Sequence, residues 1–298
     1  MIKSRDSLAE TVAVFPSVPM QGLDTVWFQV AGTVCNLACT HCFISCSPHN
    51  HSHAMLDLAA VERHLRDAEA LGVREYYFTG GEPFLNPDLM AILAAALRRG
   101  PATVLTNGTL INGRRARDLK ALADASPYSL DLRLSLDGFD AASNDAIRGA
   151  GTFARILEAA GHLREAGLNP VLTVTEACEE AGTSAGRALL LEKLKALGLD
   201  RPRLKVMPLL RIGAEASRTR DYGPEETLAG SELSRADTDA LQCSSGRMVT
   251  AKGVYVCPIL IDAPEARMGA SLGETLRPFA LKHHACHTCH AQGLNCRT

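Results

Sequence analysis

Three cysteines crowd one short stretch of this 298-residue sequence: Cys35, Cys39 and Cys42 lie in VCNLACTHCF, residues 34–43. Zinc sites usually present cysteines in paired Cys-x-x-Cys clips, whereas this loop offers an odd number. Three thiolates can bind three irons of a 4Fe–4S cubane and leave the fourth iron without a protein ligand. Such an iron can chelate the amine and carboxylate of a small molecule, so the loop indicates a reactive site rather than a structural one.

The distribution of the ten cysteines also indicates metal or redox chemistry. Four lie within residues 35–46, Cys178 stands alone, and five fall within residues 243–296. The first 22 residues contain no continuous apolar segment followed by a cleavage site, so we expect no export signal and predict a cytoplasmic protein. In a reducing cytosol, cysteines are more often metal or redox groups than a disulfide framework.

Charge and hydropathy exclude two classes of partner. The formal net charge is −2 and the sequence pI is about 6.6, so no bulk charge drives the chain toward nucleic acid or an anionic membrane. No apolar run approaches the roughly 18 residues of a membrane span. We therefore expect neither nucleic acid nor a membrane among the partners.

Short apolar runs alternate with amphipathic stretches and set the cysteines in a fold. Strands are predicted at residues 25–30, 74–80, 102–108, 130–138, 170–176 and 202–210. Helices are predicted at residues 56–72, 87–100, 113–125, 152–166 and 184–197. This order is typical of parallel βα units with right-handed crossovers, whose ligands sit at the carboxyl ends of the strands. The fold class is therefore α/β, a partial (β/α)6 TIM-like barrel followed by a small, irregular C-terminal iron–sulfur subdomain.

The motifs after the strands resemble those of the radical S-adenosylmethionine (radical SAM) superfamily. The pattern Cys35-x3-Cys39-x2-Cys42 follows the first strand and resembles the signature of that family. GGEP (80–83), TNG (106–108) and SLDG (135–138) follow the next three strands, and IRGAGTF (147–153) and MPLLRIGAEA (207–216) resemble later segments of one branch. The resemblance covers residues 25–216 and implies a 4Fe–4S cluster on the three cysteines with S-adenosylmethionine on its open iron.

The resemblance also implies a cosubstrate site. Gly80 and Gly81 would let backbone approach the methionine moiety, Glu82 would accept from its ammonium group, and Pro83 would fix the turn. Arg148 would bind the methionine carboxylate, with Ser135 as a second donor, and His41 would face the adenine. The full expected set is His41, Phe43, Gly80, Gly81, Glu82, Pro83, Thr106, Asn107, Ser135, Asp137 and Arg148. For Asp137, contact with the substrate and capping of a turn are both open.

The C-terminal cysteines resemble a second cluster site. Cys243, Cys257, Cys286 and Cys289 resemble the auxiliary-cluster extension called SPASM, or its shorter form Twitch, although Gly253 stands one residue closer to Cys257 than usual. Five cysteines fit the single-cluster Twitch form, with Cys296 spare or replacing one of the four. A structural zinc site remains an alternative because four histidines surround these cysteines. CHTCH (286–290) also matches the pattern of covalent haem c attachment, but that attachment follows export, and no export signal is expected.

The expected domains are an N-terminal segment (1–24), the radical SAM core (25–216), a linker (217–242) and the Twitch-like subdomain (243–298). The resemblance implies reductive cleavage of S-adenosylmethionine and hydrogen abstraction from a small-molecule or peptide substrate, as in natural product biosynthesis. An auxiliary cluster would make the reaction a net oxidation, and flavodoxin or ferredoxin would supply electrons.

Two other functions stay open. A redox-neutral epimerase would use Cys178 or Cys46 as hydrogen donor, and a non-catalytic iron–sulfur or zinc protein would keep only the scaffold. For the histidines at positions 49, 51 and 53, three alternatives are open: they line the substrate mouth, bind a further metal, or belong to an exposed polar loop.

Overall fold

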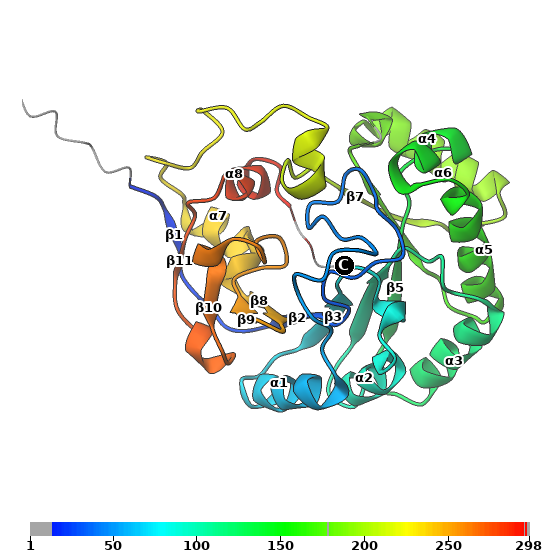
Figure 1. The fold of residues 1–298 in the computed structure, drawn as a ribbon, viewed down its shortest axis with the longest axis horizontal. Helices are drawn as coiled ribbons and strands as arrows, with labels where there is room; N and C mark the ends of the chain where they lie inside the picture. The colour runs from blue at the N-terminus through cyan, green and yellow to red at the C-terminus, as the bar shows by residue number, and fades with distance from the viewer. Residues whose placement is uncertain (1–13, 178, 295, 297–298) are drawn as a thin grey trace, which may run out of the picture.

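The computed structural model describes residues 14–177, 179–294 and 296, and its centre is a curved parallel sheet (Figure 1). Each of the six predicted strands is confirmed. They are β2 (Thr25–Gln29), β3 (Glu75–Thr79), β4 (Ala102–Thr106), β5 (Leu130–Ser135), β6 (Val171–Thr175) and β7 (Arg203–Met207). Each pairs in parallel with the next, so all six carboxyl ends lie at one edge of the sheet. The partial-barrel fold class is thereby confirmed.

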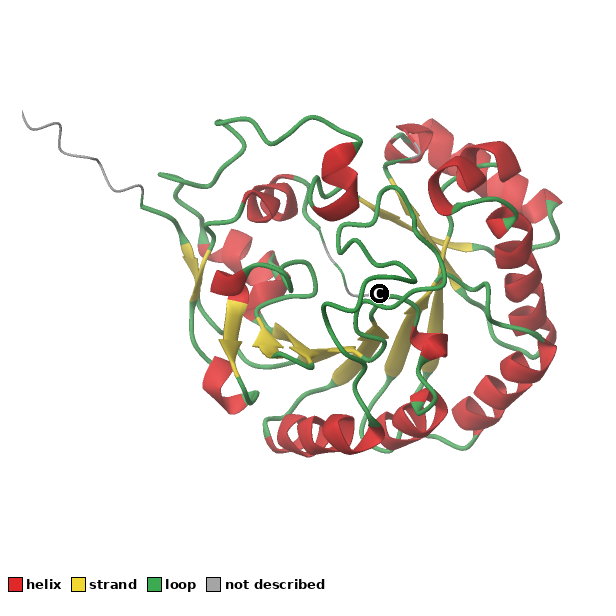
Figure 2. Ribbon diagram, viewed as in Figure 1, coloured by secondary structure: helices red, strands yellow, loops and turns green. Residues whose placement is uncertain are grey.

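The predicted helices cover the outer side of this sheet. They are α1 (Leu58–Ala70), α2 (Leu89–Ala96), α3 (Gly113–Asp124), α5 (Thr152–Glu165) and α6 (Ser184–Ala196). Side-chain caps start three of them: Asp57, Asn112 and Thr183 each accept a backbone N–H of the first turn. Figure 2 shows these helices as an outer layer against the strands.

One helix of the barrel was missed by the sequence analysis. Helix α4 (Ala141–Arg148) follows β5 and begins with a capping box between Asp140 and Ser143. It is only two turns long, so its apolar periodicity is too short to detect. The helix matters because its last residue, Arg148, belongs to the site described below.

The strands have two apolar faces with different partners. Leu130, Leu132 and Leu134 of β5 point outward and join the core between sheet and helices. Trp27 of β2 stacks on Tyr77 of β3 inside the barrel, with ring centroids 4.2 Å apart. Both rings belong to a second apolar cluster that continues into the C-terminal region, including Met248. The barrel interior is therefore packed against the C-terminal part of the chain.

The C-terminal region extends the sheet. Strand β8 (Gly246–Thr250) pairs in parallel with β2, and β9 (Gly253–Tyr255) and β10 (Arg267–Gly269) follow antiparallel to give the order β10-β9-β8-β2-β3-β4-β5-β6-β7. The remaining short elements are β1 (Ser17–Val18) paired with β11 (Phe279–Ala280), α7 (Arg235–Ala240) and α8 (His284–Ala291). The sequence analysis expected some helix within residues 211–242, where α7 lies, but placed none of these short elements individually. One sheet thus crosses residue 243, and the expected domain boundaries stay a prediction.

None of the helices found in the described residues has the length and apolar character needed to cross a membrane.

Candidate active site

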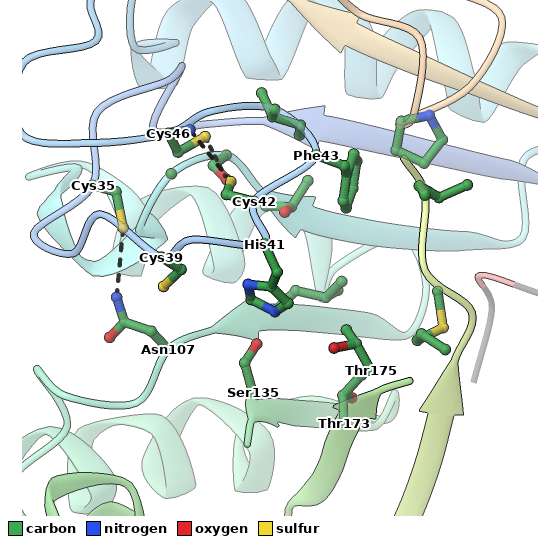
Figure 3. Close-up of a pocket in the computed structure, with 18 of the residues that line it drawn as sticks. Cys35, Cys39, His41, Cys42, Phe43, Cys46, Asn107, Ser135, Thr173 and Thr175 are labelled. Atoms are coloured by element: carbon green, nitrogen blue, oxygen red, sulfur yellow. Dashed lines mark hydrogen bonds between the residues drawn. The ribbon is translucent and has the colours of Figure 1, made fainter. Parts of the chain in front are cut away.

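A cavity of about 220 Å³ opens at the carboxyl ends of the strands (Figure 3). The three predicted ligands Cys35, Cys39 and Cys42 line it together with Cys46. Of the expected cosubstrate site, the lining residues are His41, Phe43, Gly80, Gly81, Thr106, Asn107, Ser135 and Arg148. The loop after β2 and the ends of β3, β4 and β5 therefore converge on one space, as parallel strands require.

Each sulfur of the three-cysteine motif accepts a hydrogen bond from an N–H group. Asn107 Nδ2 lies 3.7 Å from Cys35 Sγ, Arg148 Nη1 lies 3.9 Å from Cys39 Sγ, and the Cys46 N–H lies 3.3 Å from Cys42 Sγ. Such donors favour the thiolate form that iron requires.

Burial opposes ionisation of two of these thiols. It raises the pKa of Cys35 to about 12 and also raises the pKa of Cys39, whereas the side-chain hydrogen bond from Cys46 contributes most to lowering the pKa of Cys42. Buried thiols of this kind become ligands when a bound cation displaces their protons. Their position on one cavity wall and their N–H donors fit a cluster bound through three cysteines.

Gly81 brings the end of β3 against the cysteine loop. Its N–H donates to Gly32 O at 2.9 Å, and the Glu82 N–H donates to Val34 O at 3.0 Å. A Cβ added to Gly81 would stand 1.9 Å from Val34 O, so only glycine fits. The motif thus fixes the backbone that leads into Cys35, in addition to lining the cavity.

Glu82, which the resemblance places at the ammonium group of the cosubstrate, is held by protein donors. It is fully buried and accepts hydrogen bonds from Phe84 N at 3.0 Å, Thr106 Oγ1 at 2.7 Å and Asn107 N at 2.8 Å. Burial raises its pKa although all three donors oppose this. The carboxylate ties the end of β3 to the end of β4 and is not in the cavity lining among the described residues. Its expected contact with an ammonium group stays a prediction. Pro83, buried beside it, starts a 3-10 turn over Pro83–Leu85.

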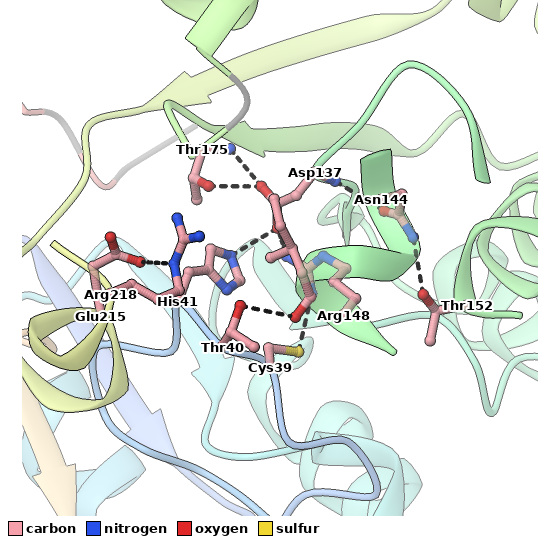
Figure 4. A network of polar contacts seen from close by, with 11 residues as sticks. Cys39, Thr40, His41, Asp137, Asn144, Arg148, Thr152, Thr175, Glu215 and Arg218 are labelled. Carbon is pink, nitrogen blue, oxygen red and sulfur yellow. Dashed lines mark hydrogen bonds and ion pairs between the residues drawn. The ribbon is translucent and has the colours of Figure 1, made fainter. Parts of the chain in front are cut away.

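Asp137 is the centre of a buried polar network (Figure 4). Its Oδ2 lies 2.7 Å from His41 Nε2 and 2.5 Å from Arg148 Nη2, and its Oδ1 accepts from the N–H and hydroxyl of Thr175 at 2.8 and 2.7 Å. Burial alone would raise the pKa of Asp137, but the charge of Arg148 and the contact with His41 outweigh it and hold the pKa below its usual range. The carboxylate therefore joins the cysteine loop, α4 and β6.

This network includes three of the expected site residues. Asp137, for which contact with the substrate and capping of a turn were both open, is fully buried, is not among the described residues of the cavity lining, and binds protein groups. Arg148 and His41 do line the cavity, but Asp137 holds both. Their expected contacts with the cosubstrate therefore start from side chains that are already fixed in place.

The five C-terminal cysteines line a second, smaller cavity of about 30 Å³. Helix α8 carries Cys286 and Cys289 one turn apart, and Cys243 and Cys257 lie on the segments flanking β8 and β9. Burial raises the pKa of all five thiols. Their gathering in one buried place fits a thiolate-bound metal group, although no three described His, Cys, Asp or Glu side chains are arranged to hold a single ion.

Cys296 belongs to both cavities. It lines the small C-terminal cavity with the other four cysteines, and it also lines the cavity at the strand ends. Its backbone carbonyl accepts a hydrogen bond from Arg133 Nη1 at 2.7 Å, which ties this residue to β5. The two groups of thiols are thus neighbours, which the sequence analysis did not predict.

The candidate residues that belong to neither cluster motif lie in different surroundings. Cys178 lies outside the described residues, whereas Cys46 is buried in the cavity wall with its Sγ 3.8 Å from Gly80 O. His49 and His51 are exposed, and His53 is buried with Nε2 3.2 Å from Asp262 Oδ1, so the three histidines do not act as one group.

Arg133, Thr173 and Thr175 line the cavity but were missed. The sequence of β5, LDLRLS, did carry a signal, since polar residues alternate there with the three leucines that face the helices.

The sequence profile described as the radical SAM superfamily matches residues 30–177, a span that includes the three-cysteine motif and the strand-end motifs. The chain belongs to the radical SAM superfamily. Curated relatives agree: a GTP 3′,8-cyclase of Synechococcus is 36% identical over 188 residues, covering 61% of this chain and 49% of its own. The mycofactocin maturase MftC of Mycobacterium ulcerans is 34% identical over 134 residues, covering 45% and 34%. The chain therefore spans half or less of these relatives.

Solved structures share the fold of this radical SAM chain. SuiB of Streptococcus suis, bound to precursor peptide SuiA, aligns with a TM-score of 0.65 over 88% of this chain and 65% of its own, at 18% identity. The structure of anSMEcpe with bound AdoMet aligns with a TM-score of 0.58 over 84% of this chain and 79% of its own, at 18% identity. Both alignments cover more of the chain than the family profile does, so the likeness includes part of the C-terminal region.

Proposed function

We propose that this chain is a radical SAM oxidoreductase whose strand-end cavity holds a 4Fe–4S cluster on Cys35, Cys39 and Cys42 with S-adenosylmethionine beside it. The observation that carries the proposal is the convergence of these three thiols, each with an N–H donor, on a cavity at the ends of the parallel strands. When bound, the cluster and cosubstrate supply a 5′-deoxyadenosyl radical that removes a hydrogen atom from the substrate.

The side chains around the cavity bind and orient. Arg148 is held by Asp137 at the cavity wall, where its remaining N–H groups can donate to a carboxylate of the cosubstrate, and Ser135 offers a hydroxyl on the neighbouring strand. His41 and Phe43 present rings to the same space. Apolar residues complete the wall, including Trp27, Leu105 and Ile259, and limit the access of water to a reactive intermediate.

For the fate of the substrate radical we propose net oxidation, either dehydrogenation or crosslinking. The support is the second group of thiols: Cys243, Cys257, Cys286 and Cys289 surround a cavity that shares Cys296 with the first. An auxiliary 4Fe–4S cluster bound there would lie next to the substrate and could accept its electron. The substrate is a small molecule or a peptide, and flavodoxin or ferredoxin is the proposed electron donor.

A second candidate is redox-neutral epimerisation with Cys46 as the hydrogen donor. The specific observation in its favour is that Cys46 lines the cavity and that its hydrogen bond to Cys42, together with burial, raises its pKa. A thiol that stays protonated keeps the S–H hydrogen that such a reaction must deliver.

The test is reductive cleavage of S-adenosylmethionine by the anaerobically reconstituted protein. With dithionite, we expect 5′-deoxyadenosine and methionine by liquid chromatography and mass spectrometry. The Cys35/Cys39/Cys42→Ala variant should form neither, while Cys46→Ala should still form both. Product formation that survives the triple substitution would contradict the assignment of these cysteines.

A further inference from the structure

Three arginines are buried in the described part of the chain, and one of them lacks the compensating groups that the other two have. Arg148 lies 2.5 Å from the carboxylate of Asp137. Arg247 donates to the backbone carbonyls of four residues, Cys243, Gly246, Thr275 and Arg277, at 2.7 to 3.2 Å. Both guanidinium groups are therefore compensated within the protein, one by an opposite charge and one by a full set of acceptors.

Arg133 has neither kind of compensation. It is 1% exposed, and its one short hydrogen bond runs from Nη1 to the carbonyl of Cys296 at 2.7 Å. Its other contacts are long: Nε lies 3.4 Å from Thr173 Oγ1, and Nη2 lies 3.9 Å from Met207 Sδ. No carboxylate of the described residues forms an ion pair with it, and Asp131 on the same strand pairs with Arg203 at 2.7 Å. A buried cation with only neutral partners is costly to fold.

The surroundings of Arg133 add positive charge. Lys205 of β7 pairs with Thr173, a residue of the cavity lining, and burial together with the charge of Arg133 lowers the pKa of Lys205 to about 8. Arg133 also lines the strand-end cavity, next to the apolar wall formed by Trp27 and Leu105.

We propose that Arg133 binds an anionic group, a carboxylate or a phosphate, of the substrate inside the barrel. This rests on the proposed function, because it names the substrate class for the same cavity. The guanidinium fork matches either oxyanion through paired hydrogen bonds, and the cost of its burial is offset when the substrate enters. Since Arg133 stands on β5 two residues before Ser135, the anion lies deeper in the barrel than the strand-end residues that face the cosubstrate.

The test is anion binding by the anaerobically reconstituted full-length protein, measured by calorimetry at constant ionic strength. The probes are inorganic phosphate and acetate, which separate the two oxyanions. Arg133→Met removes the charge, Arg133→Lys keeps the charge without the fork, and Arg203→Met is the matched control, since Arg203 pairs with Asp131 and is not in the cavity lining among the described residues. Trp27 is the sole tryptophan and lines the cavity, so its fluorescence reports whether the probe occupies this site.

We expect phosphate, acetate or both to bind the wild type and shift the Trp27 emission. Binding should weaken by about tenfold or more in Arg133→Met, weaken less in Arg133→Lys, and stay unchanged in Arg203→Met. Equal binding by Arg133→Met, equal weakening by Arg203→Met, or no binding of either probe to the wild type would overturn the proposal. If Arg133→Met does not fold, Arg133→Lys decides alone, and unchanged affinity there contradicts recognition through the fork.

A second titration separates substrate from cosubstrate. With saturating S-adenosylhomocysteine, probe binding should persist, whereas competition would assign Arg133 to the cosubstrate carboxylate and overturn the proposal. The proposed function and the proposed anion site can be refuted independently. Cleavage of S-adenosylmethionine without anion binding leaves the proposed function standing, and Arg133-dependent binding without cleavage leaves only the anion site.

Discussion

The buried carboxylate of Asp137 offers the sharpest test of how the site is held together. Asp137→Asn preserves the shape of the side chain and an oxygen for Thr175, but it removes the negative charge between His41 and Arg148. Asp137 and Arg148 are 0% and 8% exposed, so water cannot replace the lost partner. Leaving one member of a buried ion pair without the other typically costs about 3–5 kcal/mol. We expect the free energy of unfolding to fall by that amount.

The control for this substitution lies six residues earlier. Asp131 also pairs with an arginine, Arg203, but the two side chains are 30% and 43% exposed. Exposed pairs contribute only about 0–1 kcal/mol, so Asp131→Asn should change the free energy of unfolding by no more than that. Urea unfolding of both reconstituted variants at pH 7, followed by circular dichroism, gives the comparison. If Asp137→Asn costs no more than Asp131→Asn, the network does not stabilise the site.

The pH dependence adds an independent check. The pKa of Asp137 in the folded protein is lower than its ordinary value, so this carboxylate stabilises the fold above the unfolded pKa of about 3.9. That stabilisation is lost as the pH falls through the lower, folded value. The difference between wild type and Asp137→Asn should therefore be constant from pH 7 to about pH 5 and should shrink only below about pH 4. A difference that shrinks near neutral pH would point to another group.

Other substitutions test separate parts of the structure. Gly81→Ala should destabilise the protein by about 3 kcal/mol and lower its iron content, because the added Cβ would clash with the cysteine loop. The control is Gly161→Ala in α5, where a Cβ meets no neighbour and should stabilise the protein by about 0.5–1 kcal/mol. Equal effects of the two substitutions in thermal unfolding would refute the steric argument. Arg247→Met removes the donor that binds the Cys243 carbonyl, so about half of the iron should be lost while cleavage of S-adenosylmethionine persists; full iron retention would contradict this. Cys46→Ala should retain wild-type iron, and substantial iron loss would make that cysteine a ligand.

The barrel was predictable because each of its signals is local. Apolar periodicity predicts six strands and five helices, and Gly80 and Gly81 follow the end of a strand. The three-cysteine motif carries its spacing within eight residues, so its place on one loop follows from the sequence. Short elements were missed because they carry too little local pattern. Strand β8 has five residues and pairs with β2 about 220 positions earlier, a contact that no local pattern encodes.

The partners of the site residues were less predictable than the residues themselves. Asp137, Arg148 and Glu82 all belong to recognisable motifs, yet their hydrogen bonds depend on how α4, β4 and β6 come together. The resemblance implies a contact between Glu82 and the cosubstrate, but it gives no hint of the three protein donors that hold this carboxylate. Arg133 was visible as a charge on an alternating strand, but its lack of a carboxylate partner among the described residues appears only in three dimensions.

Iron content and electron paramagnetic resonance of the reconstituted wild type and of the Cys35/Cys39/Cys42→Ala variant decide whether the chain holds two clusters. The proposal of two 4Fe–4S clusters predicts about eight irons per wild-type chain, and about four irons with a reduced-cluster signal in the variant. A variant that holds no iron would contradict an auxiliary cluster on the C-terminal cysteines and, with it, the proposed net oxidation. A variant that keeps the full wild-type iron would contradict the cluster on the three-cysteine loop.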